Sequence, residues 1–284
     1  MRIGVLTGGG DCPGLDAVIR SVVRRGNSEY GYEVIGYRDG WKGPMEGDWM
    51  PLGFEQVHGI LTRGGTILGS SRTNPVKVDG GIEQIRASLE KDGVDGLIAI
   101  GGEDTLGVAR HLNDAGIRVI GVPKTIDNDL AATDYTFGFD TAVNIAMDAL
   151  DRLRTTAESH HRVMILEVMG RHAGWITAAC GLAAENVGEP PHILLFPEVP
   201  FDAERYLARV QQCVEQYGYC TIAVSEGLSD ASGNPTTQDV TATTYDGAGS
   251  RLSRQSSTLG GQAERSTYDD HGNLTAYWEG GVYD

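Results

Sequence analysis

The sequence lacks several features that would place it in other classes of protein. It has no run of about eighteen apolar residues, which argues against a membrane-spanning helix. Its four cysteines form no CxxC pair and are too few for a disulfide scaffold, so a reduced cytoplasm is the simplest setting. Basic residues are scarce, because 23 Lys and Arg face 39 Asp and Glu for a formal net charge of −16. Such a field disfavours nucleic acid and anionic membranes as partners.

Glycine, in contrast, is abundant, with 40 residues in a chain of 284, a length that suits one large or two modest domains. Apolar segments of strand type alternate with segments of helical spacing. Strands are predicted at residues 2–7, 33–37, 96–100, 119–122, 163–168 and 219–225, and helices from residue 16 onward and at 81–91, 105–115, 140–157, 173–182 and 202–216. The first strand starts at once, so we expect no signal peptide. The alternation predicts an α/β fold with a doubly wound parallel sheet and helices on both faces.

The composition changes after residue 226. Residues 227–284 are rich in Gly, Ser, Thr, Asp and Asn and have almost no aliphatic clusters. Within them, Tyr245–Leu252 is echoed by Tyr268–Thr275 at an offset of 23 residues, and Tyr283-Asp284 closes the chain. One interpretation is a disordered polar tail. The other is a pair of strand-turn repeats, because Asp, Asn and Gly lie where hairpin turns need them.

Charged side chains follow two neighbouring predicted strands. Glu103 and Asp104 come after the strand at 96–100, and Lys124, Asp127 and Asp129 come after the strand at 119–122. Doubly wound sheets bind ligands at such strand ends. Carboxylates there can hold Mg²⁺ and accept a hydroxyl proton, while a lysine can neutralise a phosphate. The two aspartates alone fit helix caps equally well, but the whole cluster favours phosphoryl transfer.

Other candidate residues give weaker evidence of a functional role when each is considered alone. The glycines at 8–10 form either a tight turn or a loop whose N–H groups approach a phosphate. Arg72 and Arg162 by themselves fit surface arginines. Arg171 directly follows an apolar strand, so it belongs to another strand-end loop.

Residues 1 to about 226 resemble the phosphofructokinase family. The shared motifs are Gly-Gly-Asp-Cys-Pro-Gly at 9–14, Gly-Ser-Ser-Arg at 69–72, Gly-Gly-Glu-Asp at 101–104, Lys-Thr-Ile-Asp-Asn-Asp at 124–129, Met-Gly-Arg at 169–171 and Ser-Glu-Gly at 225–227. The resemblance implies two Rossmann-like domains. Residues 1–137 would bind the donor phosphate and Mg²⁺, residues 138–227 would form a truncated sugar-phosphate domain, and residues 228–284 would be a foreign polar tail.

The resemblance also implies roles in the transfer of a phosphoryl group to fructose 6-phosphate. Asp127 would be the general base toward the sugar 1-hydroxyl, supported by Thr125 and Asp129, and Arg171 would stabilise the moving phosphoryl group. Glu103 stands where the family has a Mg²⁺-binding carboxylate. The implied binding residues are Gly9, Arg72, Asp104 and Lys124 for the donor, and Met169, Gly170 and Glu226 for the sugar. Arg162 would reach the 6-phosphate in a neighbouring subunit, which implies a homodimer or homotetramer.

The phosphoryl donor follows from two of these positions. Members of the family that use ATP carry glycine where this chain has Asp104 and Lys124. Asp104 would add bulk and negative charge near the α-phosphate, whereas Lys124 would suit the free end of pyrophosphate. The pair therefore resembles the pyrophosphate-dependent branch, with ATP as the alternative donor. Asp16 also departs from the usual asparagine and adds to the acidity of the first loop.

The resemblance to the family ends before its last sugar-binding segment. Residues 235–284 instead resemble the Tyr-Asp (Rhs-type) repeats of large secreted bacterial shell proteins. The chain therefore looks like a truncated phosphofructokinase joined to foreign sequence. We expect apolar surface of the helix at 140–157 and the strand at 219–225 to be poorly covered. An inactive fragment, or an interaction protein dominated by its repeats, is the alternative function.

Overall fold

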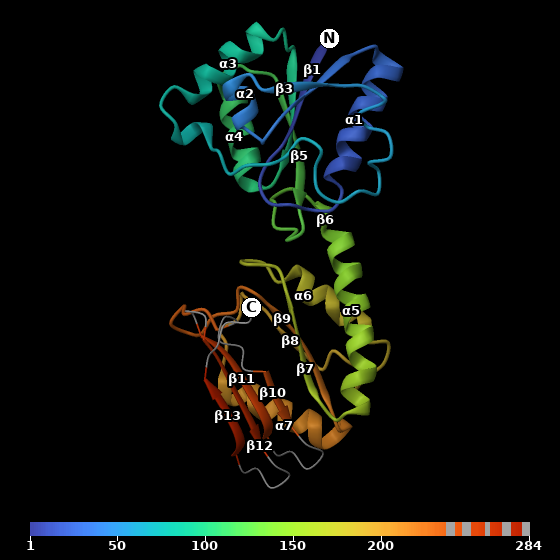
Figure 1. Cartoon of the computed structure of the whole chain (residues 1–284), viewed down its shortest axis with the longest axis vertical. Helices are drawn as coiled ribbons and strands as arrows, with labels where there is room; N and C mark the ends of the chain where they lie inside the picture. The colour runs from blue at the N-terminus through green and yellow to red at the C-terminus, as the bar shows by residue number, and fades with distance from the viewer. Residues whose placement is uncertain (237–241, 246–250, 259–261, 269–273, 280–284) are drawn as a thin grey trace. The chain divides into compact units, whose positions relative to one another are not determined.

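The computed structural model describes residues 1–236, 242–245, 251–258, 262–268 and 274–279 (Figure 1). The chain divides into two compact units, Met1–Asp140 and Thr141–Asp284. The closing Tyr283-Asp284 pair lies outside the described residues.

Unit 1 contains a six-stranded sheet in the order β3-β2-β1-β4-β5-β6. Its strands are β1 (Arg2–Thr7), β2 (Glu33–Tyr37), β3 (Trp49–Leu52), β4 (Gly96–Gly101), β5 (Val119–Thr125) and β6 (Phe137–Gly138). The predicted parallel sheet is confirmed for β1, β2, β4, β5 and β6, whereas β3 at one edge runs antiparallel to β2. The connection from Tyr37 to Trp49 is too short for a parallel crossover, which needs about a dozen residues or more.

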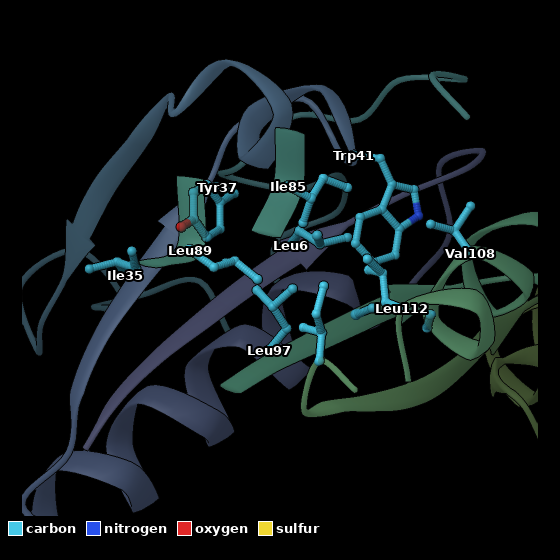
Figure 2. Packing of buried hydrophobic residues seen from close by; sticks show 12 residues of the cluster. Leu6, Ile35, Tyr37, Trp41, Ile85, Leu89, Leu97, Val108 and Leu112 are labelled. Atoms are coloured by element: carbon cyan, nitrogen blue, oxygen red, sulfur yellow. The ribbon is translucent and has the colours of Figure 1, made fainter. Parts of the chain in front are cut away.

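Helices cover both faces of this sheet. Figure 1 shows α1 (Leu15–Tyr30) on one face and α2 (Lys42–Glu46), α3 (Gly81–Lys91) and α4 (Glu103–Asp114) on the other. Successive strand residues point to opposite faces, so Leu6 joins the core under α3 and α4, whereas Val5 joins the core under α1. The first core, which includes Leu6, Ile85 and Leu112, is shown in Figure 2. A short 3₁₀ helix, η1, spans Pro75–Lys77.

The α1 face of the sheet is only partly covered. An apolar groove of about 680 Å³ is lined by Ile3 of β1, Val22 of α1, and Ile98 and Ile120 of β4 and β5. Ile120 is 67% exposed although it lies within a strand of the sheet. The described side chains of unit 1 therefore leave an apolar groove open at this face.

Unit 2 begins within α5 (Phe139–Ser159), which continues from unit 1. Its three-stranded parallel sheet has the order β7-β9-β8, with β7 at Val163–Val168, β8 at Ile193–Leu195 and β9 at Cys220–Ser225. The remaining helices are α6 (Trp175–Cys180), η2 (Gly181–Ala183) and α7 (Ala203–Tyr217). No helix in the described ranges is long and apolar enough to cross a bilayer.

The expectation of a poorly covered strand in unit 2 is wrong. All residues of β9 are buried, because β7 and β8 pair with its two edges and α7 packs on the sheet through Val210 and Cys213. The expectation for α5 is met in part. Ile145 is 63% exposed, as expected of a poorly covered apolar side, whereas Leu150 is buried.

The described residues after 236 form four antiparallel strands in sequence order. They are β10 (Ala242–Tyr245), β11 (Arg251–Thr258), β12 (Gln262–Tyr268) and β13 (Leu274–Glu279). Tyr245 pairs with Arg251, and Tyr268 pairs with Leu274, so the two hairpins share one register at the 23-residue offset of the sequence. Each pairing also shifts just before its tyrosine, as at a β-bulge. The described strands thus follow the strand-turn interpretation, while the predicted turns at 246–250 and 269–273 lie outside them.

Candidate functional site

The glycine loop, residues 8–14, connects β1 to α1. Gly9 and Gly14 have φ values of 83° and 94°, which favour glycine. A Cβ on Gly8 would collide with the side chain of Thr105, and a Cβ on Gly101 would collide with the same threonine. Thr105 is buried at the start of α4, so it holds this helix against the glycine loop. The sequence contains the two glycines as motif residues but gives no sign of their common neighbour.

Lys124 lies in β5 and not in the loop after it. Its side chain is only 3% exposed, and its Nζ donates a hydrogen bond to the carbonyl oxygen of Gly10 at 2.6 Å. Burial lowers the pKa of Lys124, while the nearby Asp11 and Asp127 carboxylates oppose that shift. A lysine is therefore held against the glycine loop, at the end of the strand that leads to Asp127.

Glu103 and Asp104 belong to the first turn of α4, which begins two residues before the predicted helix at 105–115. Both side chains are exposed. The helix begins after Gly102 with free backbone N–H groups, which favour an anion at this end. Glu103 and Asp104 thus lie beside a helix end suited to a phosphate. Their negative charges would repel a donor whose phosphate groups come too close to them.

The loop after β5 holds its aspartates through backbone contacts. The N–H of Asp127 donates to the hydroxyl of Thr125 at 3.2 Å, and Asp127 is half-buried. Asn128 has a φ of 53°, and its Oδ1 accepts from the N–H of Thr136 at 2.9 Å. Thr136 in turn donates to the carbonyl of Thr125 at 2.6 Å. Asp129 is exposed. The sequence identified the aspartates but missed Asn128 and Thr136, which close the loop.

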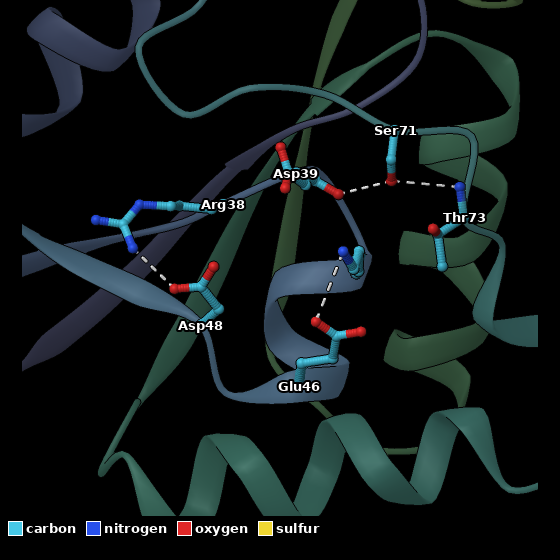
Figure 3. A network of polar contacts seen from close by, with 7 residues as sticks. Arg38, Asp39, Glu46, Asp48, Ser71 and Thr73 are labelled. Atoms are coloured by element: carbon cyan, nitrogen blue, oxygen red, sulfur yellow. Dashed lines mark hydrogen bonds and ion pairs between the residues drawn. The ribbon is translucent and has the colours of Figure 1, made fainter.

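Arg72 is exposed on a loop that serines tie to two strand ends. The hydroxyl of Ser70 donates to the carbonyl of Gly9 at 2.5 Å. The hydroxyl of Ser71 donates to the carbonyl of Asp39 at 2.6 Å, as Figure 3 shows. The loop that carries Arg72 is therefore fixed to the glycine loop itself.

In unit 2, the ends of β7 and β9 bring three predicted residues together. Oε1 of Glu226 accepts from the N–H of Gly170 at 3.3 Å, and the hydroxyl of Ser225 donates to the carbonyl of Gly170. A Cβ on Gly227 would collide with the backbone of Arg171. The Arg171 side chain is exposed. Burial, and then the Glu226 carboxylate, raise the pKa of Glu167, so this strand end gathers negative charge.

Two further predicted residues of unit 2 lie at opposite ends of β7. Met169 follows the strand and is 57% exposed. Arg162 precedes the strand, is exposed, and donates its backbone N–H to the carbonyl of Ala157 at 2.9 Å. Within the described part of unit 2, Arg162 is thus separated from Gly170 and Glu226 by the length of a strand.

A magnesium ion would have to use few protein ligands. Among the residues that the structure describes, no group of three or more His, Cys, Asp or Glu side chains could hold a metal ion. Magnesium in phosphoryl-transfer sites is typically bound by one or two carboxylates together with substrate phosphates. The exposed carboxylate of Glu103, at the phosphate end of α4, fits that pattern.

The strand-end loops and the glycine loop define a phosphotransferase of the α/β class, and sequence comparison agrees. The profile of the family described as Phosphofructokinase matches residues 2–267, so the chain belongs to the phosphofructokinase family.

Among its relatives is the pyrophosphate–fructose 6-phosphate 1-phosphotransferase of Amycolatopsis methanolica, with 62% identity over 233 residues, which cover 82% of this chain and 67% of that enzyme. The ATP-dependent 6-phosphofructokinase 3 of Streptomyces coelicolor is 54% identical over 234 residues, again covering 82% of this chain and 67% of the relative. The solved pyrophosphate-dependent phosphofructokinase from Marinobacter aquaeolei matches with a TM-score of 0.73 and 32% identity, over 81% of this chain and 62% of that one. The chain thus spans about two thirds of the length of these relatives.

Proposed function

We propose that the chain transfers a phosphoryl group from pyrophosphate to the 1-hydroxyl of fructose 6-phosphate, giving fructose 1,6-bisphosphate and phosphate. The observation that carries the choice of donor is the buried Lys124, which lies against the carbonyl of Gly10 in the phosphate-type loop. Asp104, in the first turn of α4, adds a carboxylate where a longer nucleotide would extend. One residue thus retains a short donor and the other disfavours ATP.

The chemistry assigned to unit 1 is proton removal and donor binding. Asp127 takes the proton from the sugar 1-hydroxyl while the oxygen of that hydroxyl attacks the terminal phosphorus of pyrophosphate. The bridging P–O bond then breaks and phosphate is released. The Thr125 hydroxyl supports this role because it accepts a hydrogen bond from the backbone N–H of Asp127, and Asp129 adds a second carboxylate. Gly9 and Arg72 would bind the donor phosphates. Glu103 would hold Mg²⁺, which when bound neutralises charge on the phosphates.

The roles assigned to unit 2 are sugar binding and charge stabilisation. Met169, Gly170 and Glu226 would hold the sugar, and the contact of Glu226 with the Gly170 N–H supports a shared site. Arg171 would stabilise the phosphoryl group in transit. Arg162 is exposed at the other end of β7, which supports a contact with the 6-phosphate bound by a neighbouring subunit in a homodimer or homotetramer.

The domain boundaries at 137 and 227 are part of the proposal, with residues 228–284 as a separate repeat segment. The equal register of its two described hairpins supports a repeat of the Tyr-Asp type. All four cysteines are free and buried, which supports a reducing cytoplasm.

The test is a coupled assay of the purified chain with fructose 6-phosphate and Mg²⁺, comparing pyrophosphate with ATP and monitoring fructose 1,6-bisphosphate. A clear preference for pyrophosphate is expected. ATP is the second candidate donor, because a relative named for ATP is 54% identical, and a preference for ATP would reassign the donor. Turnover with neither donor would support the remaining alternative, an inactive or interaction-dominated fragment.

A further inference from the structure

Asp16 is a buried carboxyl group whose two oxygens have different surroundings. It is the second residue of α1, and its side chain is 0% exposed. Oδ1 accepts a hydrogen bond from the backbone N–H of Ile67 at 2.8 Å. Oδ2 is buried and has no hydrogen-bond partner among the described residues. An ionised carboxylate in this position would leave a negative charge half-unpaired in the protein interior, which is strongly unfavourable.

Ile67 belongs to the donor loop, residues 66–72, which ends in Arg72. Other contacts tie this loop to β1, because the Thr7 hydroxyl lies 2.8 Å from the Thr66 hydroxyl and donates to the carbonyl of Gly69 at 2.8 Å. The serines near Arg72 tie it to the glycine loop and to the end of β2. Asp16 adds a hydrogen bond from α1 to this loop. Among the hydrogen bonds named here, it is the one whose acceptor is an ionisable group.

The charges that face Asp16 come from two other segments. The Asp11 carboxylate in the glycine loop disfavours ionisation of Asp16, and the Arg63 guanidinium before the donor loop favours it. Burial is the largest influence and raises the pKa of Asp16. The hydrogen bond from the Ile67 N–H and the Arg63 guanidinium lower that pKa without cancelling the effect of burial, so the pKa of Asp16 lies above its usual range. In its uncharged form the side chain accepts from Ile67 through one oxygen, as the amide oxygen of an asparagine would.

We propose that Asp16 is a positioning residue that, as an uncharged acid, holds the donor loop and its Arg72 in place for pyrophosphate. The role rests on the proposed function, because Arg72 matters here only as a ligand of the donor. Ionisation at higher pH would put an unpaired charge beneath the loop and weaken donor binding.

The sign of the pH effect follows from the raised pKa. Between the unfolded pKa of about 3.9 and the higher folded pKa, the folded state holds the proton more tightly, so stability falls as pH rises. Asp16→Asn cannot ionise and keeps the acceptor for Ile67. Its melting temperature should equal that of the wild type near pH 4 and exceed it at pH 8, by roughly 3 °C or more.

The experiment measures the melting temperature, pyrophosphate binding by calorimetry without sugar, and KM and kcat, each across pH 5–9. Asp16→Asn should bind pyrophosphate with wild-type affinity at low pH and lose less affinity as pH rises. Asp16→Ala, which lacks the acceptor, should raise Kd and KM for pyrophosphate about tenfold, with a smaller change in kcat. Glu29→Gln, at an exposed carboxylate in the last turn of the same helix, is the matched control and should change none of these.

The outcomes separate the positioning role from the proposed function. Wild-type affinity in Asp16→Ala, or a lower melting temperature for Asp16→Asn than for wild type at pH 8, overturns the role of Asp16. Binding of pyrophosphate that follows the expected pattern without any turnover overturns the proposed reaction and leaves the role of Asp16 standing. If the wild type does not bind pyrophosphate at all, both are overturned.

Discussion

Replacing Lys124 by methionine tests the donor site most directly, because it removes one charge while keeping a side chain of similar length. The substitution deletes the 2.6 Å hydrogen bond from Nζ to Gly10 and a cation beside the glycine loop. Hydrogen bonds that involve a charged group are worth about 1.5–3 kcal/mol. If Lys124 contributes a hydrogen bond of that strength to the bound donor phosphate, its loss should lower kcat/KM for pyrophosphate roughly 10- to 150-fold.

Stability should respond in the opposite sense to activity. Burial lowers the pKa of Lys124, so the unfolded chain holds this proton more tightly than the folded chain does. Wild-type stability should therefore rise as pH increases from the folded pKa toward the unfolded value of about 10.4, and Lys124→Met should lack that rise. At neutral pH the variant should melt at or above the wild-type temperature.

The assay compares kcat/KM for pyrophosphate, and thermal melting, in the wild type and in Lys124→Met. Lys91→Met is the control, because Lys91 is exposed in the last turn of α3. It should leave both quantities unchanged. A loss of less than about threefold in Lys124→Met would refute the reasoning, as would an equal loss in both variants.

Three further changes test the rest of the site and the fold. Asp127→Ser should lower kcat by about 10²–10⁴-fold with little change in KM, and a loss below about tenfold would remove Asp127 as the general base. Replacing Asp104 and Lys124 together by glycine should weaken the use of pyrophosphate and admit ATP, unless the unmodified chain already prefers ATP. A family-type C-terminal segment in place of residues 228–284 should raise both the melting temperature and the activity, because it would add the family's last sugar-binding segment and cover exposed apolar side chains of α5 such as Ile145. A cooperative melt above about 60 °C with full turnover in the unmodified chain would contradict that expectation.

Much of the secondary structure was predictable because it depends on local patterns. The predicted strands at 2–7, 33–37 and 163–168 and the helix at 81–91 have the observed boundaries. The sequence missed β3, β6 and β8, which are short and carry too few residues to show a clear alternation. Burial was harder to predict, because the exposure of Ile145 depends on which neighbours reach α5 and not on spacing within the helix.

The sequence by itself determined the family, the α/β alternation and the residue types of the site, because glycine loops and strand-end acids are local motifs. Only the tertiary structure placed Lys124 against Gly10, which is 114 positions away in the chain, and Asp16 against Ile67, which is 51 positions away. It also decided that Asp16 is fully buried, with one oxygen that has no hydrogen-bond partner among the described residues. The physical reason is that the charge state and reach of a side chain depend on desolvation and on neighbours brought in by folding, and no local pattern records those neighbours.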